Sequence, residues 1–94
     1  MPVVVIVEGI TEEQYEESVR KLAGKERVES SSDWPVAGLL AHIAGPGENG
    51  FRVIDVWESQ EALDSFAAKL IPVMDELGAE GKHEIYQAHS FVTA

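Results

Sequence analysis

The sequence contains no cysteine, and this absence excludes several kinds of chemistry at once. Disulfide bonds, thiolate nucleophiles, iron–sulfur ligation and cysteine-type zinc sites all require a thiol that this chain does not supply. A cysteine-free composition fits a reducing compartment, and we expect the protein to be cytoplasmic.

Basic residues are also few, since 7 Lys and Arg stand against 17 Asp and Glu, for a formal net charge of −10. A negative surface repels phosphate backbones and anionic lipid headgroups, so we expect neither nucleic acid nor a membrane as a partner. Long apolar runs are missing too. The run VVVIV at residues 3–7 is too short to span a bilayer and has no basic segment before it, so it predicts a strand, not a signal peptide.

Hydrophobic periodicity predicts six elements in a single domain of residues 1–94. They are a strand at 3–7, a helix from the capping box at Thr11 to a stop at Gly24, strands at 37–44 and 51–58, a helix capped by Ser59, and a strand at 83–92. A glycine-rich link joins the middle strands as a β-hairpin, and Pro72 is predicted to end or kink the second helix. The order βαββαβ predicts an α+β, ferredoxin-like fold with a four-stranded antiparallel sheet.

The two hairpin strands carry apolar residues on both faces. Centring the hairpin on its glycine-rich turn sets Ala44 opposite Phe51 and His42 opposite Val53, and side chains alternate between faces along a strand. One predicted face, which suits packing beneath the helices, carries Leu39, Ala41, Ile43, Ile54 and Val56. The other predicted face carries Leu40, His42, Phe51, Val53, Asp55 and Trp57.

Two helices can cover only one face of the sheet, so the other face needs a different cover. A bare apolar patch of several hundred Å² is rare on a soluble monomer. Covering it at ~25 cal/mol per Å² is worth several kcal/mol, which is comparable to the stability of a small domain. We therefore predict a homodimer in which the mixed faces of two sheets close around a cavity.

The block GLLAHIAGPGENGFRVIDVWESQEALDSF, residues 38–66, resembles small proteins of the antibiotic biosynthesis monooxygenase-like, dimeric α/β-barrel superfamily. The segment VWES followed by an amphipathic helix is the most typical feature, and members without an assigned substrate are the most similar. The resemblance implies a ferredoxin-like fold and a dimer. In the cofactor-free monooxygenases of this superfamily, a polar group assists deprotonation of an electron-rich aromatic substrate, and the resulting anion itself reduces oxygen.

The haem-degrading branch of the superfamily is expected to be excluded. That branch uses a histidine late in the second helix region and an asparagine on the first strand. Here no histidine lies between Ser59 and Lys82, and the first strand carries valines and Glu8. Phe66 alone stands near that branch's aromatic position. We expect no cofactor and no metal.

His42 and Asp55 are the candidate catalytic residues. In the predicted register they are diagonal neighbours on one face, and a carboxylate that orients an imidazole gives a general base near neutral pH. The alternative is a structural hydrogen-bonded pair at the dimer interface. A one-residue slip in register would place the two side chains on opposite faces.

Around this pair we expect a pocket for a small aromatic or apolar molecule. The predicted substrate-binding residues are Trp34, Leu40, Phe51, Val53, Trp57, Tyr86 and His89. Trp34 is either a lid over the cavity or a core residue on a loop, and Tyr86 is either a proton donor or a residue of the barrel rim. His83 and His89 share a face of the last predicted strand but are too far apart along it to chelate a metal as a pair.

Three functions stay open. The first is a cofactor-independent monooxygenase, the second is a non-catalytic ligand-binding or sensor dimer, and the third is an interaction scaffold with a filled interior. A void beside His42 would favour the first two, and an interior filled by side chains would favour the third.

Overall fold

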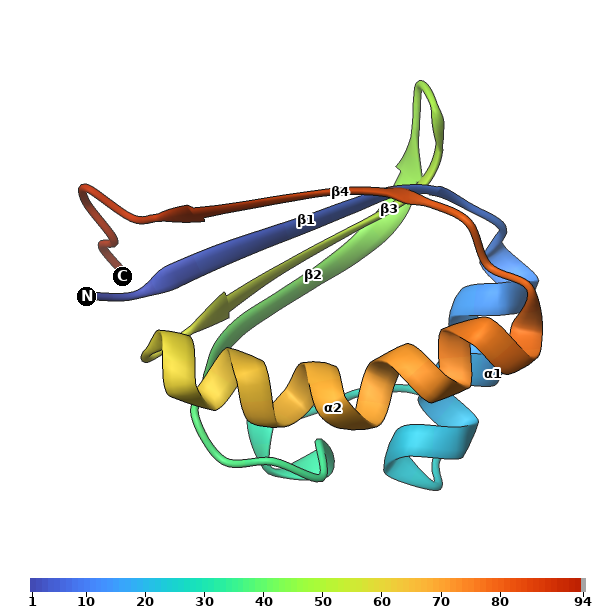
Figure 1. The fold of residues 1–94 in the computed structure, drawn as a ribbon, viewed down its shortest axis with the longest axis horizontal. Helices are drawn as coiled ribbons and strands as arrows, with labels where there is room; N and C mark the ends of the chain where they lie inside the picture. The colour runs from blue at the N-terminus through green and yellow to red at the C-terminus, as the bar shows by residue number, and fades with distance from the viewer. Residues whose placement is uncertain (94) are drawn as a thin grey trace.

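The computed structural model describes residues 1–93 without the side chain of Ser31, so Ala94 of the predicted 1–94 domain lies outside the described residues. The elements are β1 (Val3–Ile10), α1 (Glu12–Ala23), the short 3₁₀ helix η1 (Ser31–Asp33), β2 (Leu39–Gly47), β3 (Gly50–Trp57), α2 (Gln60–Leu77) and β4 (Lys82–Gln87). This arrangement confirms the predicted βαββαβ order (Figure 1).

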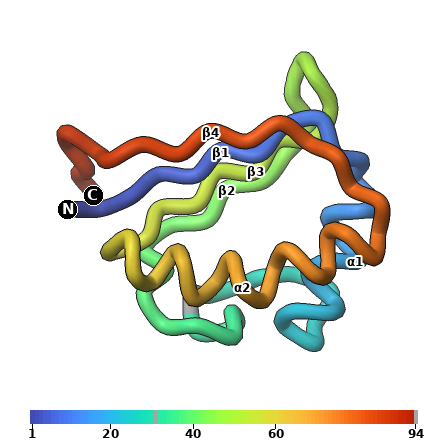
Figure 2. The backbone as a smooth tube through the Cα atoms, viewed as in Figure 1, coloured from blue at the N-terminus to red at the C-terminus, as the bar shows by residue number. Residues whose placement is uncertain are grey.

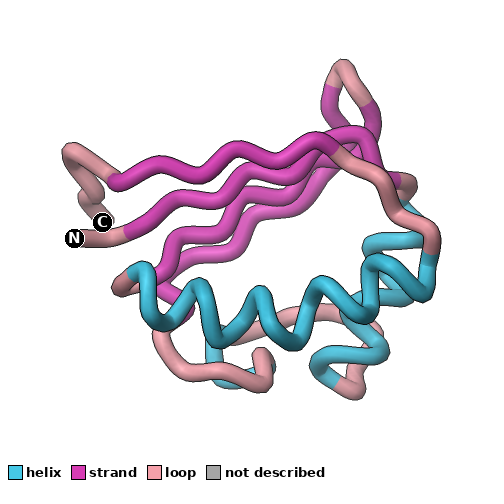
Figure 3. Tube along the Cα trace, viewed as in Figure 1, coloured by secondary structure: helices cyan, strands magenta, loops and turns pink. Residues whose placement is uncertain are grey.

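The four strands form one antiparallel sheet in the order β2-β3-β1-β4. Both helices lie against the same face of this sheet, and the described residues place no helix on the opposite face (Figure 3). β1 begins and β4 ends at the same end of the sheet, where Val3 pairs with Gln87 (Figure 2). The predicted ferredoxin-like fold is therefore confirmed.

Local sequence signals set the helix boundaries as predicted, with one exception. The Thr11 side chain and backbone exchange hydrogen bonds of 3.0 Å with Gln14, and α1 ends at Gly24 with φ of 69°. Ser59 caps α2 by accepting a hydrogen bond from the backbone of Ala62. Pro72 does not end α2, which continues to Leu77, because the proline lies on the exposed side where solvent can replace one lost hydrogen bond. None of the described helices combines the length and apolar composition that crossing a bilayer requires.

The hairpin register differs from the prediction by two residues. His42 pairs with Asp55, Ala44 pairs with Val53, and Gly47 pairs with Gly50 across a two-residue turn. The prediction was wrong because Gly45 to Gly47 continue β2 as a strand instead of belonging to the turn. A shift of two residues keeps every side chain of the regular part on its own face.

The prediction of which face meets the helices was wrong. Trp57, Val53, Asp55 and His42 lie on the helix-covered face, which we call the inner face. The opposite side, here called the outer face, carries the aliphatic residues Val4, Ile6, Ala41, Ile43, Ile54 and Val56 and, on β4, Glu84 and Tyr86. The inner face takes the helices because large aromatic side chains fill the space between the two layers. Trp57, Trp34 and Phe66 meet there, with ring centroids about 5 Å apart.

Candidate functional site

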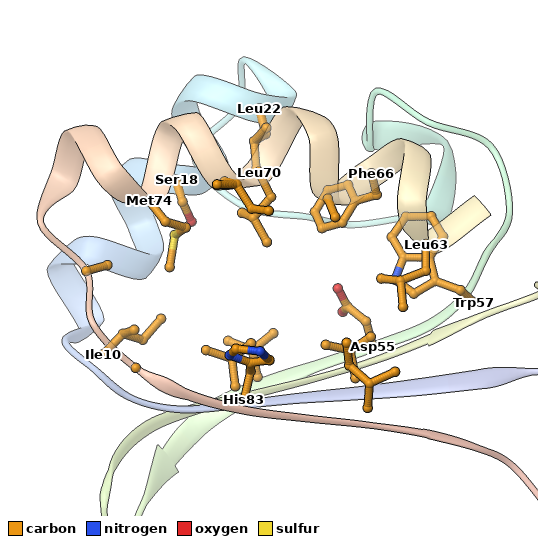
Figure 4. A pocket seen from close by; sticks show the side chains of 18 of the residues that line it. Ile10, Ser18, Leu22, Asp55, Trp57, Leu63, Phe66, Leu70, Met74 and His83 are labelled. Atoms are coloured by element: carbon orange, nitrogen blue, oxygen red, sulfur yellow. The ribbon is translucent and has the colours of Figure 1, made fainter. Parts of the chain in front are cut away.

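A cavity of about 390 Å³ lies between the sheet and the two helices of one chain. Its floor includes Val5 and Val53 from the strands, and its roof includes Leu63, Phe66 and Leu70 from α2. Figure 4 shows the carboxylate of Asp55 directed into this space from the sheet, with Phe66 and Leu70 directed toward it from the helix. The cavity is large enough for a small organic molecule and is mostly apolar. It is not formed between two sheets, so the predicted location of the cavity was wrong.

Three polar side chains from different elements meet at the wall of this cavity. His42 on β2 places Nδ1 2.6 Å from Oδ1 of Asp55 on β3. Its other ring nitrogen, Nε2, lies 2.6 Å from the phenolic oxygen of Tyr15 on α1. We call Tyr15, His42 and Asp55 the triad; all three line the cavity.

The donor and acceptor roles in the triad follow from its carboxylate. An ionised carboxylate can only accept, so Nδ1 of His42 carries the proton and donates it to Asp55. The Nε2 atom of a neutral imidazole is then an acceptor, and the phenol of Tyr15 donates to it. The basic lone pair of His42 is therefore directed at the phenolic oxygen of Tyr15. A ligand on the far side of Tyr15 would contact this oxygen and not His42 itself.

Burial strengthens these interactions. The side chains of His42 and Asp55 are only 11% and 10% exposed, so water screens their charges weakly. Burial, together with the negative charge of Asp55, raises the pKa of Tyr15 above its ordinary value of 10.0. Tyr15 is therefore a neutral phenol at physiological pH, with a proton to donate to His42.

Aromatic rings hold the imidazole in place. The Trp34 ring contacts His42 edge-on at 5.4 Å between centroids, and the Tyr15 ring lies nearly parallel to the imidazole, with centroids 5.9 Å apart, and reaches it through its hydroxyl. Phe51 packs against Tyr15 at 4.9 Å. Within the described residues, the indole Nε1 atoms of Trp34 and Trp57 are buried without a hydrogen-bond partner. Each is an unused donor in the wall around the cavity.

Most of the predicted site residues do lie together. Trp34, Val53 and Trp57 line the cavity with the two predicted catalytic residues. Phe51 stands behind Tyr15 and supports it without lining the cavity. Trp34 belongs to the buried core as well as to the cavity wall, so its side chain anchors a loop whose neighbouring residues Ser32 and Pro35 are exposed.

Three predicted site residues lie elsewhere. A bulge between Leu39 and Ala41 removes Leu40 from the inner face and leaves it 44% exposed. Tyr86 pairs with Val4 and so lies on the outer face, 47% exposed. His89 is exposed beyond the end of β4, because the last strand stops at Gln87 and not at residue 92.

Sequence reasoning missed several polar residues of the cavity, which are Tyr15, Ser18, Gln60, Asp64, Asp75 and His83. Tyr15 falls among the apolar residues of α1 at helical spacing, and a tyrosine there carries a hydroxyl that needs a partner. His83 on β4 also lines the cavity, opposite α2. Within residues 1–93, no three His, Asp or Glu side chains gather closely enough to hold a metal ion.

Solved structures with the same architecture include Rv0793 from Mycobacterium tuberculosis, with a TM-score of 0.66, 13% identity, and coverage of 99% of this chain and 100% of that one. A point mutant of SnoaB, a cofactor-independent oxygenase from Streptomyces nogalater, gives a TM-score of 0.64 at 14% identity over 99% and 97% of the two chains. A Deinococcus radiodurans protein, provisionally named an antibiotic biosynthesis monooxygenase, has a TM-score of 0.58 and 14% identity. The match covers 100% of this chain and 98% of that one.

The chain shares the ferredoxin-like fold of these solved structures. The likeness confirms the fold that residues 38–66 predicted, and at 13–14% identity it extends to the fold alone. No family model and no curated protein matches the sequence. Within this fold, the triad and cavity are what the chain's own residues supply.

Proposed function

We propose that the protein is a cofactor-independent monooxygenase-like enzyme that acts on a small aromatic or apolar molecule in its cavity. The observation that carries this proposal is the triad of Tyr15, His42 and Asp55, joined by two 2.6 Å contacts beside a mostly apolar void. The shared fold of SnoaB, a cofactor-independent oxygenase by name, supports the same class of reaction.

The triad supplies a base for the first step. A substrate hydroxyl gives its proton to the phenolic oxygen of Tyr15 while Tyr15 passes its own proton to Nε2 of His42. The resulting imidazolium is stabilised by the carboxylate of Asp55, 2.6 Å from Nδ1. The substrate becomes an anion that accepts a hydrogen bond from Tyr15, and the protonated His42 on the other side of that phenol balances its charge.

Dioxygen is the oxidant in the second step. The anion adds O₂ at an electron-rich ring carbon and takes up a proton, which gives a hydroperoxide. If that carbon began as CH₂, loss of water leaves C=O there, so one oxygen atom enters the product and the other enters water. The substrate supplies all the electrons, and the apolar walls keep bulk water from the reactive anion.

A non-catalytic binding or sensor protein is the second candidate function. The cavity alone supports it, because a void of about 390 Å³ can hold a ligand whether or not a reaction follows. The third possibility, a scaffold with a filled interior, is not favoured by a void next to His42.

The test is oxygen uptake by the purified protein with a panel of phenols and anthrone-type compounds. His42→Ala removes the proton acceptor and should abolish turnover, because general base catalysis contributes about 10²–10⁴-fold. Tyr15→Phe should lower kcat by a similar factor while binding persists.

The matched control is His89→Ala, because His89 is exposed and does not line the cavity. Full activity in the His42 variant would refute the proposed base. Ligand binding by the wild type without oxygen uptake or product would favour the binding protein.

We also propose that the chain forms a homodimer through the outer face, in the cytoplasm. Ile43 is 60% exposed and lies beside Ile54 and Ala41 on a sheet surface that no described helix covers. The chain exposes 5975 Å², whereas a compact monomer of this mass exposes about 5,400 Å². A second copy applied to this face would cover its exposed apolar side chains, Ile43 above all. The cytoplasmic location rests on the cysteine-free composition.

A further inference from the structure

The charged residues that line the cavity are of one sign. Its described lining includes the carboxylates of Asp55, Asp64 and Asp75 but no lysine and no arginine. Two histidines, His42 and His83, are the remaining side chains there that can carry a positive charge. Of these, His42 is already engaged by Asp55 at 2.6 Å.

Two of the carboxylates stand at the mouth of the cavity. Asp64 and Asp75 are exposed residues of α2 that line the cavity, and Ile71 lies between them in the sequence with 58% of its surface exposed. Across from them on β4, Ile85 lines the cavity and is 49% exposed. A ligand therefore enters between α2 and β4, past a rim that combines exposed apolar side chains with carboxylates and His83.

The inner end of the cavity also disfavours negative charge. The phenolate form of Tyr15 is penalised there by burial first and by the charge of Asp55 second, and both effects raise the pKa of Tyr15. An anionic oxygen brought to the same place by a ligand would meet the same desolvation and the same repulsion. The rim and the inner end of the cavity thus both disfavour a negatively charged ligand.

We propose that the cavity admits uncharged and cationic molecules and rejects anionic ones, so that its substrates are weakly acidic phenols or enols without carboxylate or phosphate groups. This inference rests on the proposed function, because it describes the ligand of the same cavity. It also fits the proposed proton transfer. A neutral phenol carries its hydroxyl proton into the site and gives it to Tyr15, whereas a phenolate that arrives already ionised has no hydroxyl proton to give.

The experiment compares three ligands with the same ring system: 2-naphthol, 6-hydroxy-2-naphthoate and 6-(aminomethyl)-2-naphthol. Their affinities are measured by isothermal titration calorimetry at pH 7 and low ionic strength. The naphthoate should bind at least about tenfold more weakly than naphthol, and the amine at least as tightly as naphthol. The difference should narrow as salt is added, because the rim carboxylates are exposed and screened by ions.

Variants locate the source of the discrimination. The double variant Asp64→Asn, Asp75→Asn removes the rim charges and should bring naphthoate binding to within about threefold of naphthol binding. The control double variant Glu13→Gln, Glu48→Gln removes the same net charge from the start of α1 and from the hairpin turn, two places that do not line the cavity. This control should retain the discrimination of the wild type.

The outcomes separate the inference from the proposed function. If all three ligands bind equally, the charge selection is refuted while the cavity remains a ligand site. If naphthol itself does not bind at millimolar concentration, both the selection and the proposed function fail for this class of molecule. If the rim variant discriminates as strongly as the wild type, the assignment of selection to Asp64 and Asp75 is wrong.

Discussion

The inner and outer faces of the sheet are both rich in apolar side chains, yet they are covered in opposite ways. The inner face carries His42, Asp55 and Trp57 and lies under two helices, where Trp57 is fully buried. The outer face is aliphatic along its centre and has no helix over it in the described residues, where Ile43 is 60% exposed. The face with the polar groups is the enclosed one.

This contrast shows that the more apolar face of a sheet is not always the face that meets the protein's own helices. A buried polar group is tolerated when it is hydrogen-bonded, and the triad satisfies His42 and Asp55 inside the inner layer. On the outer face, Val4 and Val56 are buried beside Ala88, but Ile43 remains 60% exposed. This face needs a second surface, which is the reason that a partner is expected on the outer side and a ligand on the inner side.

The largest expected effect concerns the core of the inner layer. Phe66→Ala should lower the free energy of unfolding by about 3–5 kcal/mol, because Phe66 is 4% exposed and packs between Trp34 and Trp57. Ile43→Ala on the outer face should change it little at low protein concentration, and more as concentration rises and a dimer forms. Urea unfolding at several protein concentrations measures both. An equal, concentration-independent loss in the two variants would contradict the contrast between the faces.

Self-association gives the next largest effect. Ile43→Glu places a charge on the outer face, twice in a two-fold dimer, and should weaken dimerisation on the order of a hundredfold. Ile71→Glu is the matched control, since Ile71 is similarly exposed at 58% but lies on α2 at the cavity mouth. Sedimentation velocity over a range of concentrations distinguishes the two variants. A folded wild-type chain that stays monomeric at micromolar concentration would refute the dimer.

The smallest effect is a pH dependence that belongs to the inner face. Because the pKa of Tyr15 is raised, the folded state holds the phenolic proton more tightly than the unfolded chain does. This contribution to stability is fully present below the ordinary pKa of 10.0 and is lost as the pH rises from there through the folded-state pKa. Urea midpoints between about pH 8 and pH 11 should fall for the wild type and fall less for Tyr15→Phe. The urea midpoint of the outer-face variant Tyr86→Phe should fall with pH as much as that of the wild type. If it fell only as little as that of Tyr15→Phe, the pH dependence would not come from the cavity.

Local signals in the sequence predicted much of this fold. The caps at Thr11 and Ser59 and the stop at Gly24 are satisfied by residues within four positions, so they can be read without tertiary information. The four-stranded antiparallel sheet followed from the βαββαβ pattern. The proximity of His42 and Asp55 was also predictable, because an error of two residues in register keeps both on one face.

The rest depended on contacts that no local pattern encodes. Alternation shows which side chains share a face but not which face the helices choose. The bulge that displaces Leu40 depends on how two strands fit together, not on either strand alone. The contact of Tyr15 with His42 joins a helix to a strand 27 positions further along the sequence, so it was not visible from either element.

The cavity, its entrance and the whole triad come from a single polypeptide. Dimerisation would therefore not be needed to complete the site. The two chambers of such an assembly would lie back to back, each opening away from the shared seam. Dimerisation and turnover would then be separable properties. The interface would contribute to stability, and each subunit would carry out its reaction independently.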